Sequence, residues 1–164
     1  MAVLPTSVRY ANFDTTVIHF VPTIASATLA ATRAEITAGT NLTGEISDVS
    51  GFTVTGSTID APDLLSEFVS KVPGRTSAED SSLTFYASEN GTDVRSILPY
   101  KTTGYIVIMP GGDVPSTGKM DVFPVRVTSA ASPTISVGDD LAKINVGFAI
   151  TREPKLNVAI PAAT

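Results

Sequence analysis

The chain lacks cysteine and tryptophan and has a single histidine, His19. Without cysteine it forms no disulfide, no thiolate metal site and no thiol nucleophile, and its redox compartment stays undecided. A serine triad would depend on His19, which lies among β-branched and aromatic residues, and the chain has no Gly-x-Ser-x-Gly turn to present a serine. We therefore expect His19 to be packed or interfacial, and an enzyme is the least favoured class.

Charge is also scarce. Asp, Glu, Lys and Arg make up 16% of the 164 residues, against about 25% in ordinary globular chains. Thr and Ser largely replace them, and the mean hydropathy is +0.23. Two interpretations remain open from composition: a Thr-rich β surface on a monomer, or a surface that partners cover. The net charge of -5 argues against a nucleic-acid reader, which normally carries a basic patch.

Long apolar runs are absent as well. The longest clear one spans residues 105–109, whereas a membrane-spanning helix needs about 20 residues. Residues 1–13 contain Pro5 and Arg9 and lack the apolar core of a signal peptide. We expect a soluble protein, made in a cytoplasm, with no membrane partner.

What the chain does have is β-forming residues punctuated by 12 Gly and 11 Pro. Val, Ile, Thr, Phe and Tyr between frequent turn residues are typical of many short strands, so the predicted class is mostly β. The clearest alternation of apolar and polar residues covers 143–151 and places Phe148 on a core face. The expected strands are 16–21, 51–59, 82–87, 104–109, 119–128 and 143–151.

One short helix is predicted over residues 92–98, capped by Thr92 and ended by Pro99. Residues 60–71 fit either a helix capped by Asp60 or an extended crossing. The domain prediction is a β-sandwich over 14–153, with an N-terminal arm at 1–13 and a C-terminal arm at 154–164, both outside the core.

Three segments resemble ligand-binding motifs but lack residues that such motifs require. Residues 112–120 resemble a phosphate-binding loop, but five residues separate the two glycines and Met120 stands where Ser or Thr would bind Mg²⁺. The pairs Asp60 with Asp63 and Asp139 with Asp140 lack the ligand count of a calcium loop and suit turns or helix starts better. We therefore expect no catalytic residue, no metal and no cofactor.

The order of several segments is more informative than any single motif. In the first half these are TRAEITAGT at 32–40, GFT at 51–53, IDAPDL at 59–64, Phe68 and VPGR at 72–75. In the second half they are DSSLTFY at 80–86, DVR at 93–95 with Ile97 and Leu98, GYIV at 104–107, DVFPV at 121–125 and VGFAIT at 146–151, then Glu153 and Pro154. Over about residues 20–161 this series resembles the siphophage major tail tube proteins.

The resemblance implies a two-sheet β-sandwich or half-open barrel with one short flanking helix. It also implies hexameric rings that stack into a hollow, non-contractile tube in the phage tail, assembled in the host cytoplasm. Expected partners are other copies of the chain, the tape measure protein, and terminator and tail-tip proteins. DNA would pass through the lumen without specific binding. The two termini and the segment 38–50, expected as a loop, become candidates for contacts between rings.

A lumen that bound phosphate would slow DNA ejection, so weakly acidic walls are expected. The candidates for lumen-facing acids are Glu35, Glu45 and Asp48. Other classes stay open: a capsid-decoration or other virion β-domain, a tube subunit of a contractile tail or injection system, and a carbohydrate-binding β-sandwich. The last would usually present Trp or Tyr platforms, and this chain has no Trp and four Tyr.

Overall fold

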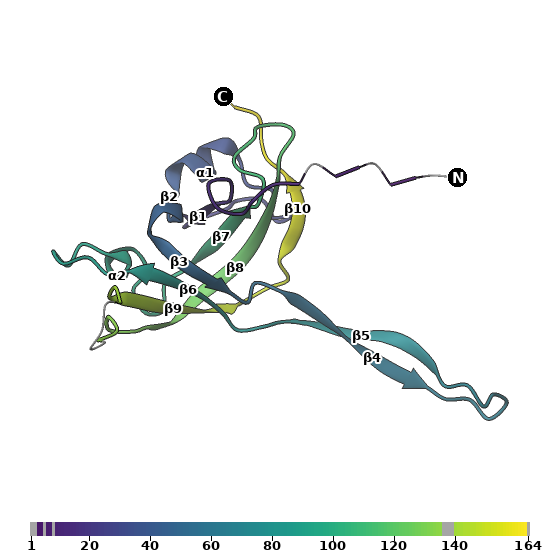
Figure 1. Ribbon diagram of the computed structural model, residues 1–164. Helices are drawn as coiled ribbons and strands as arrows, with labels where there is room; N and C mark the ends of the chain where they lie inside the picture. The colour runs from purple at the N-terminus through teal and green to yellow at the C-terminus, as the bar shows by residue number, and fades with distance from the viewer. Residues whose placement is uncertain (1–2, 5, 8, 136–139, 164) are drawn as a thin grey trace. The chain divides into compact units, whose positions relative to one another are not determined.

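The computed structural model describes residues 3–4, 6–7, 9–135 and 140–163, so Asp139 of the second acidic pair lies outside the described residues. The fold is mostly β, with an eight-stranded and a two-stranded sheet and few helices (Figure 1), as predicted for the fold class. The chain forms two compact units. The first comprises Met1–Gly44, Gly104–Phe123 and Lys155–Thr164, and the second comprises Glu45–Thr103 and Pro124–Pro154.

In the first unit, β1 (Val17–Val21) lies between the two-residue β2 (Thr40–Asn41) and β7 (Thr103–Met109), antiparallel to both. β8 (Lys119–Ala130) neighbours β7, and its first half pairs with β10 (Lys155–Ala159). Alternation on β7 and β8 sends apolar side chains to a shared core. That core consists of Val21, Ile24, Leu29, Ala31, Ile36, Val107, Met109, Met120, Val122 and Ile160.

The helix α1 (Arg33–Ala38) of this unit begins at a capping box. The Thr32 hydroxyl accepts a hydrogen bond from the Glu35 backbone N–H, and the Glu35 carboxylate accepts one from Thr32 N at 2.7 Å. The helix ends at Gly39, whose N–H donates to the carbonyls of Glu35 and Ile36. Only Ile36 of its six residues is buried, and it reaches the core cluster.

The second unit follows a single 3-10 turn at Thr43–Glu45. Its sheet runs in the order β8, β9 (Lys143–Ile150), β6 (Ser81–Tyr86), β3 (Ile46–Ser50). β6 and β9 pair antiparallel and bury Leu83, Phe85 and Phe148. A short helix, α2 (Val94–Ile97), precedes β7 and is capped by Asp93 rather than by Thr92.

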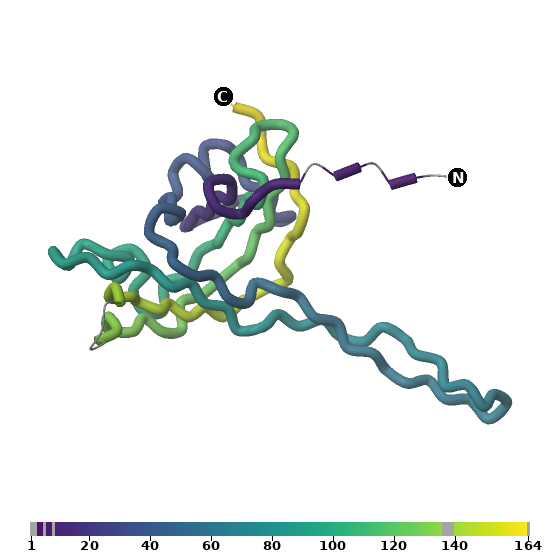
Figure 2. The backbone as a smooth tube through the Cα atoms, viewed as in Figure 1, coloured from purple at the N-terminus to yellow at the C-terminus, as the bar shows by residue number. Residues whose placement is uncertain are grey.

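The second unit also contains the two-stranded sheet, a long hairpin of β4 (Val54–Ala61) and β5 (Ser70–Ala78). Figure 2 shows the backbone running out along β4 and returning along β5. Gly51, just before the hairpin, has φ +79°, and an added Cβ would lie 2.6 Å from the Asp80 carbonyl oxygen. Only glycine fits this close approach.

All six predicted strands are confirmed, with ends shifted by a few residues. The helical interpretation of 60–71 is wrong, because these residues end β4, turn, and begin β5. The segment 38–50 is not a loop, since it contains β2, the 3-10 turn and β3. The expectation that 154–164 lies outside the core is also wrong, because β10 pairs with β8 and Ile160 is buried.

Candidate functional site

No group of three or more His, Cys, Asp or Glu residues in the described part of the chain is arranged to hold a metal ion. Among those same residues, no helix combines the length and apolarity needed to span a membrane. The loop 110–118, which contains most of the phosphate-loop lookalike, connects the neighbouring strands β7 and β8. The candidate sites are therefore surfaces, and the β4–β5 hairpin carries the most unusual one.

The hairpin exposes one pair of apolar side chains next to a salt bridge. Ile59 lies opposite Val72, and the next pair in the ladder is Asp60 opposite Lys71. Successive pairs point to opposite faces of a sheet, so Ile59 and Val72 share one face while the Asp60–Lys71 salt bridge lies on the other. Ile59 is 59% exposed and Val72 51% exposed. A two-stranded hairpin by itself is at best marginally stable in water, so a partner that covers Ile59 and Val72 would stabilise it.

The turn of the hairpin, residues 62–69, which we call the tip, exposes larger apolar side chains. Leu64 and Leu65 are fully exposed and Phe68 is 78% exposed. Local bonds fix this turn: the Asp63 carboxylate accepts from Leu65 N at 2.8 Å, and Ser66 Oγ accepts from Phe68 N at 3.1 Å. A monomer rarely exposes apolar groups of this size together, and such patches commonly mark interaction surfaces.

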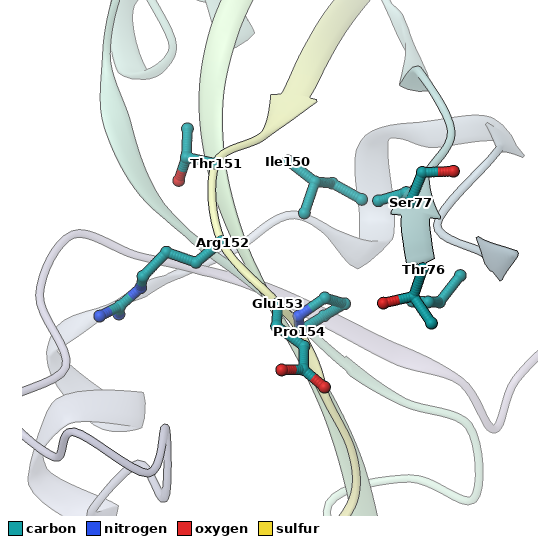
Figure 3. A pocket seen from close by; sticks show the side chains of 9 residues that line it. Thr76, Ser77, Ile150, Thr151, Arg152, Glu153 and Pro154 are labelled. Carbon is teal, nitrogen blue, oxygen red and sulfur yellow. The ribbon is translucent and has the colours of Figure 1, made fainter. Parts of the chain in front are cut away.

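A groove of about 190 Å³ lies at the opposite end of the hairpin, within the second unit (Figure 3). We call it the root groove. It is lined by the first residue of β4, the last residues of β5, the end of β9 and the segment that follows β9. Its apolar lining comes from Val54, Ala78, Ile150 and Pro154, and its polar lining includes Thr76 and Ser77.

A second cluster, in the first unit, is charged. Arg33 of α1 forms a two-pronged salt bridge with Asp113 of the β7–β8 loop, at 2.6 and 2.9 Å, and donates to the Pro161 carbonyl at 3.1 Å. The Arg33 hydrogen bonds lower the pKa of Asp113, and the same pairing raises the pKa of Arg33. This cluster ties α1, the loop and the C-terminal segment together, which is a structural role.

His19 lies on β1 near this cluster and is partly buried. Burial lowers the pKa of its imidazole, and a hydrogen bond with the Ile36 backbone opposes that shift in part. Its Nδ1 atom has no hydrogen-bond partner among the described residues. The sequence predicted a packed or interfacial histidine, and the structure shows His19 partly buried on β1.

The three candidate lumen acids differ in setting. Glu35 accepts hydrogen bonds from Thr32 and from Ala25 N, which lower its pKa, so its carboxylate is already bound within its own chain. Glu45 ends the 3-10 turn and Asp48 lies in β3, and both are exposed. Glu35 belongs to the first unit and the other two belong to the second.

Strands β3, β4 and β5 each have an unpaired edge among the described residues. β4 and β5 pair only with each other, and β3 pairs only with β6, within the described residues. Unpaired edges invite pairing with another chain unless they are protected. A mostly β chain with open edges, an exposed apolar hairpin and no metal cluster among its described residues has the features of a structural subunit built for assembly.

The comparison with known families agrees with this class. The chain belongs to the phage tail tube protein family, which matches residues 5–163. It is therefore a structural component of a tail tube and not an enzyme. No curated protein sequence matches it.

Solved structures share the fold. The sheath/tube terminator of the PVC extracellular contractile injection system in its extended state is 15% identical, with a TM-score of 0.63, covering 89% of this chain and 96% of that one. The tube-terminating cap of the anti-feeding prophage is 15% identical, with a TM-score of 0.59, covering 95% of this chain and 99% of that one. A chain of the PVC sheath-tube complex in its extended state is 15% identical, with a TM-score of 0.60, and the match covers 88% of this chain and 90% of that one.

Proposed function

We propose that this protein polymerises as stacked hexameric rings into the hollow, non-contractile tube of a phage tail, through which DNA leaves the particle. Family membership supports the tube role. The exposed hairpin is the main support for polymerisation, because β4 is exposed along its whole length and the tip exposes two leucines and a phenylalanine. Burial of that apolar surface against neighbouring subunits stabilises the assembly.

Edge pairing supplies the second part of the proposal. The open edge of β3 can continue its sheet into a neighbouring subunit by ordinary backbone hydrogen bonds. A contact between two different surfaces of the same chain is heterologous, and it closes into a ring when its rotation closes. The tape measure protein, a terminator and tail-tip proteins are the remaining proposed partners, and assembly in the host cytoplasm belongs to the same proposal.

For the lumen we propose acidic walls that do not retain DNA. Each phosphate neutralised by a base would add affinity through counterion release, so an excess of acids over bases suits passage. The chain has 16 acids and 11 bases. Glu45 and Asp48 have exposed carboxylates, which supports them as wall residues. Glu35 keeps its negative charge while capping α1, and remains a third proposed wall residue.

A tube subunit enclosed by a contractile sheath is the second candidate. The solved structures with this fold come from contractile injection systems, and at 15% identity they share the fold alone. The two candidates differ in whether a sheath protein coats the tube. Co-expression with the sheath-like proteins of the same genome, followed by electron microscopy of the particles, separates them.

The test of polymerisation is negative-stain microscopy of the purified protein across a concentration series. Hollow tubes or six-fold rings are the expected result. A monodisperse monomer at high concentration, which also fails to assemble when tape measure and tail-tip proteins are added, would contradict the proposal. Phe68→Ala, which removes a tip side chain that is 78% exposed, is the matched variant and should assemble less well.

A further inference from the structure

We propose that protonation of His19 opens a clasp between Arg33 and Asp113, so that the subunit releases its β7–β8 loop and its last residues from α1 in mildly acidic solution. The clasp consists of the Arg33 guanidinium, the Asp113 carboxylate and the Pro161 carbonyl, all within the first unit. It is a device of the single subunit. The inference therefore goes beyond the proposed polymerisation and does not depend on it.

A single guanidinium makes all the bonds of the clasp. Arg33 Nη1 and Nη2 donate to the two Asp113 oxygens at 2.6 and 2.9 Å, and Nη2 also donates to the Pro161 carbonyl at 3.1 Å. The side chain of Arg33 is 15% exposed and that of Asp113 is 32% exposed. Solvent therefore weakens this pair less than it weakens a fully exposed one.

The loop and the C-terminal segment are bonded to each other as well. Ser116 N donates to the Ile160 carbonyl at 3.2 Å, and Ile160 N donates to the Gly118 carbonyl at 3.0 Å. In Figure 1 the end of the chain runs beside this loop. Arg33 thus fastens a joined loop and C-terminal segment to α1, and both can leave the helix together when the clasp opens.

His19 lies next to the clasp with one ring nitrogen unused. It stands opposite Val107 in the β1–β7 ladder, so its imidazole is on the face of the sheet that carries the core. Its Nδ1 atom is buried without a hydrogen-bond partner among the described residues, while the Ile36 backbone bonds to the ring. Arg33 and Asp113 both act electrostatically on the imidazole, and His19 acts in turn on Asp113, so the three groups are close enough to sense one another.

Protonation upsets the charge balance of the clasp. With neutral His19, one guanidinium faces one carboxylate. Charged His19 adds a second cation, which repels Arg33 and attracts Asp113. The new Nδ1–H also needs an acceptor, since a buried donor without one is costly. Asp113 stays ionised, because the Arg33 hydrogen bonds hold its pKa below its ordinary 3.8, and it cannot keep both oxygens on Arg33 while it serves His19.

The other titratable or charged groups around His19 do not restore this balance. The Glu35 carboxylate of α1 is bound to Thr32 and Ala25, and β2 contains no charged residue. Tyr105 of β7 is on the same face as His19, and a phenol carries no charge in acidic solution. In β8 the charged residues alternate with the core residues and so point to the opposite face; they are Lys119 and Asp121.

The direction of the pH dependence follows from the burial of His19. Burial lowers the pKa of the imidazole below 6.5 in the closed form, whereas an opened clasp gives the ring more solvent and a pKa nearer its ordinary value. The closed form is therefore favoured most above about pH 6.5, and this advantage is lost as the pH falls through the lower pKa of the closed form. One proton changes the ratio of open to closed subunits by at most about tenfold per pH unit.

A spin label on the C-terminal segment tests the release. Because the chain contains no cysteine, Ala162→Cys provides a single attachment site, and Ala162 is exposed. Electron paramagnetic resonance of dilute subunit should show a mobile fraction that grows as the pH falls, by up to about tenfold per pH unit. His19 is the only histidine, so its proton NMR signals give its titration directly. The two midpoints should coincide.

Two variants in the labelled background are the controls. Glutamine in His19→Gln can still donate to the Ile36 backbone but does not titrate, so the label should stay immobile down to about pH 5. Asp113→Asn removes the charge that holds Arg33, so its label should be mobile at every pH. Far-UV circular dichroism that stays constant over the same range shows that the segment is released without unfolding of the subunit.

A label whose mobility does not change while His19 titrates would overturn the proposal, and so would an equal change in His19→Gln. If His19→Gln does not fold, the labelled protein with His19 decides, because label and imidazole midpoints that differ would also overturn the clasp. None of these measurements involves tubes. Failure of the clasp therefore leaves the polymerisation standing, and a protein that forms no tubes can still show the release.

Discussion

Truncation of two phenylalanines to alanine should have opposite effects: Phe148→Ala should destabilise the subunit, and Phe68→Ala should impair assembly without destabilising it. Phe148 on β9 is 1% exposed, pairs across the sheet with Ser81 and Val127, and its ring lies 6.2 Å from that of Phe52 at 49°. Phe68 in the tip is 78% exposed. The same chemical deletion therefore leaves a cavity at Phe148 and removes only solvent-exposed surface at Phe68.

The expected magnitude follows from burial. Phe148→Ala loses the transfer free energy of a whole buried ring and leaves an unfilled space, which together cost about 3–5 kcal/mol of unfolding free energy. For a chain of this length, each kcal/mol lowers Tm by about 2–4 °C, so a drop of about 6–20 °C is expected. Phe68→Ala should change the subunit's stability by no more than about 0.5 kcal/mol.

The assay is thermal and urea unfolding of dilute subunit, followed by tube yield at high concentration. Phe148→Ala should melt early, whereas Phe68→Ala should melt normally and assemble poorly. An unchanged melting temperature for Phe148→Ala would refute its place in the core. Normal tube yield from Phe68→Ala would refute the role of the tip in assembly.

Three further predictions concern the termini, pH and charge. Deletion of residues 155–164 removes β10 and the buried Ile160, so it should destabilise the subunit in urea, whereas deletion of 162–164 should not; equal stability of both would contradict the role of β10. Burial lowers the pKa of His19 below its ordinary 6.5, so the folded state binds that proton more weakly than the unfolded state. The stability that this difference contributes is fully present above about pH 6.5 and is lost as the pH falls from there through the lower pKa of the folded state. The unfolding free energy of His19→Gln should therefore change less with pH over this range. A pH profile identical to that of the unmodified protein would show that His19 does not contribute. Glu45→Lys should leave tubes intact but reduce DNA delivery, measured as infectivity of particles built with the variant subunit; unchanged delivery would remove Glu45 from the lumen wall.

The sequence predicted the strands whose alternation is strong. The pattern at 143–151 sends Ile144, Val146 and Phe148 to one side, and the structure buries all three. Period-two burial is a property of each strand itself, so it can be read without knowing the neighbours. The mostly β class rests on the same signal and needs no tertiary information.

The misinterpreted segments are those where tertiary pairing decides. Leu64, Leu65, Phe68 and Val69 have helical spacing, yet they belong to a hairpin turn whose apolar side chains point into solvent. The spacing of apolar residues cannot distinguish a helix that buries them against a core from a turn that leaves them exposed. β10 was missed because residues 155–159 alternate weakly, and their place is set by pairing with β8 from a distant part of the chain.

The candidate surface was only partly predictable. The low charge content raised the idea of a covered surface, but composition could not say which residues form it. The groove at the hairpin root joins residues 54, 76–78 and 150–154, which lie far apart in sequence. α1 offered a readable signal, since Thr32 followed three residues later by Glu35 fits a capping box.

Electron microscopy of the purified protein above and below its assembly concentration tests the central claim most directly. The account predicts hollow tubes with six-fold symmetry whose density places each tip against a neighbouring subunit. Compact single subunits at every concentration, with or without tape measure and tail-tip proteins, would contradict it.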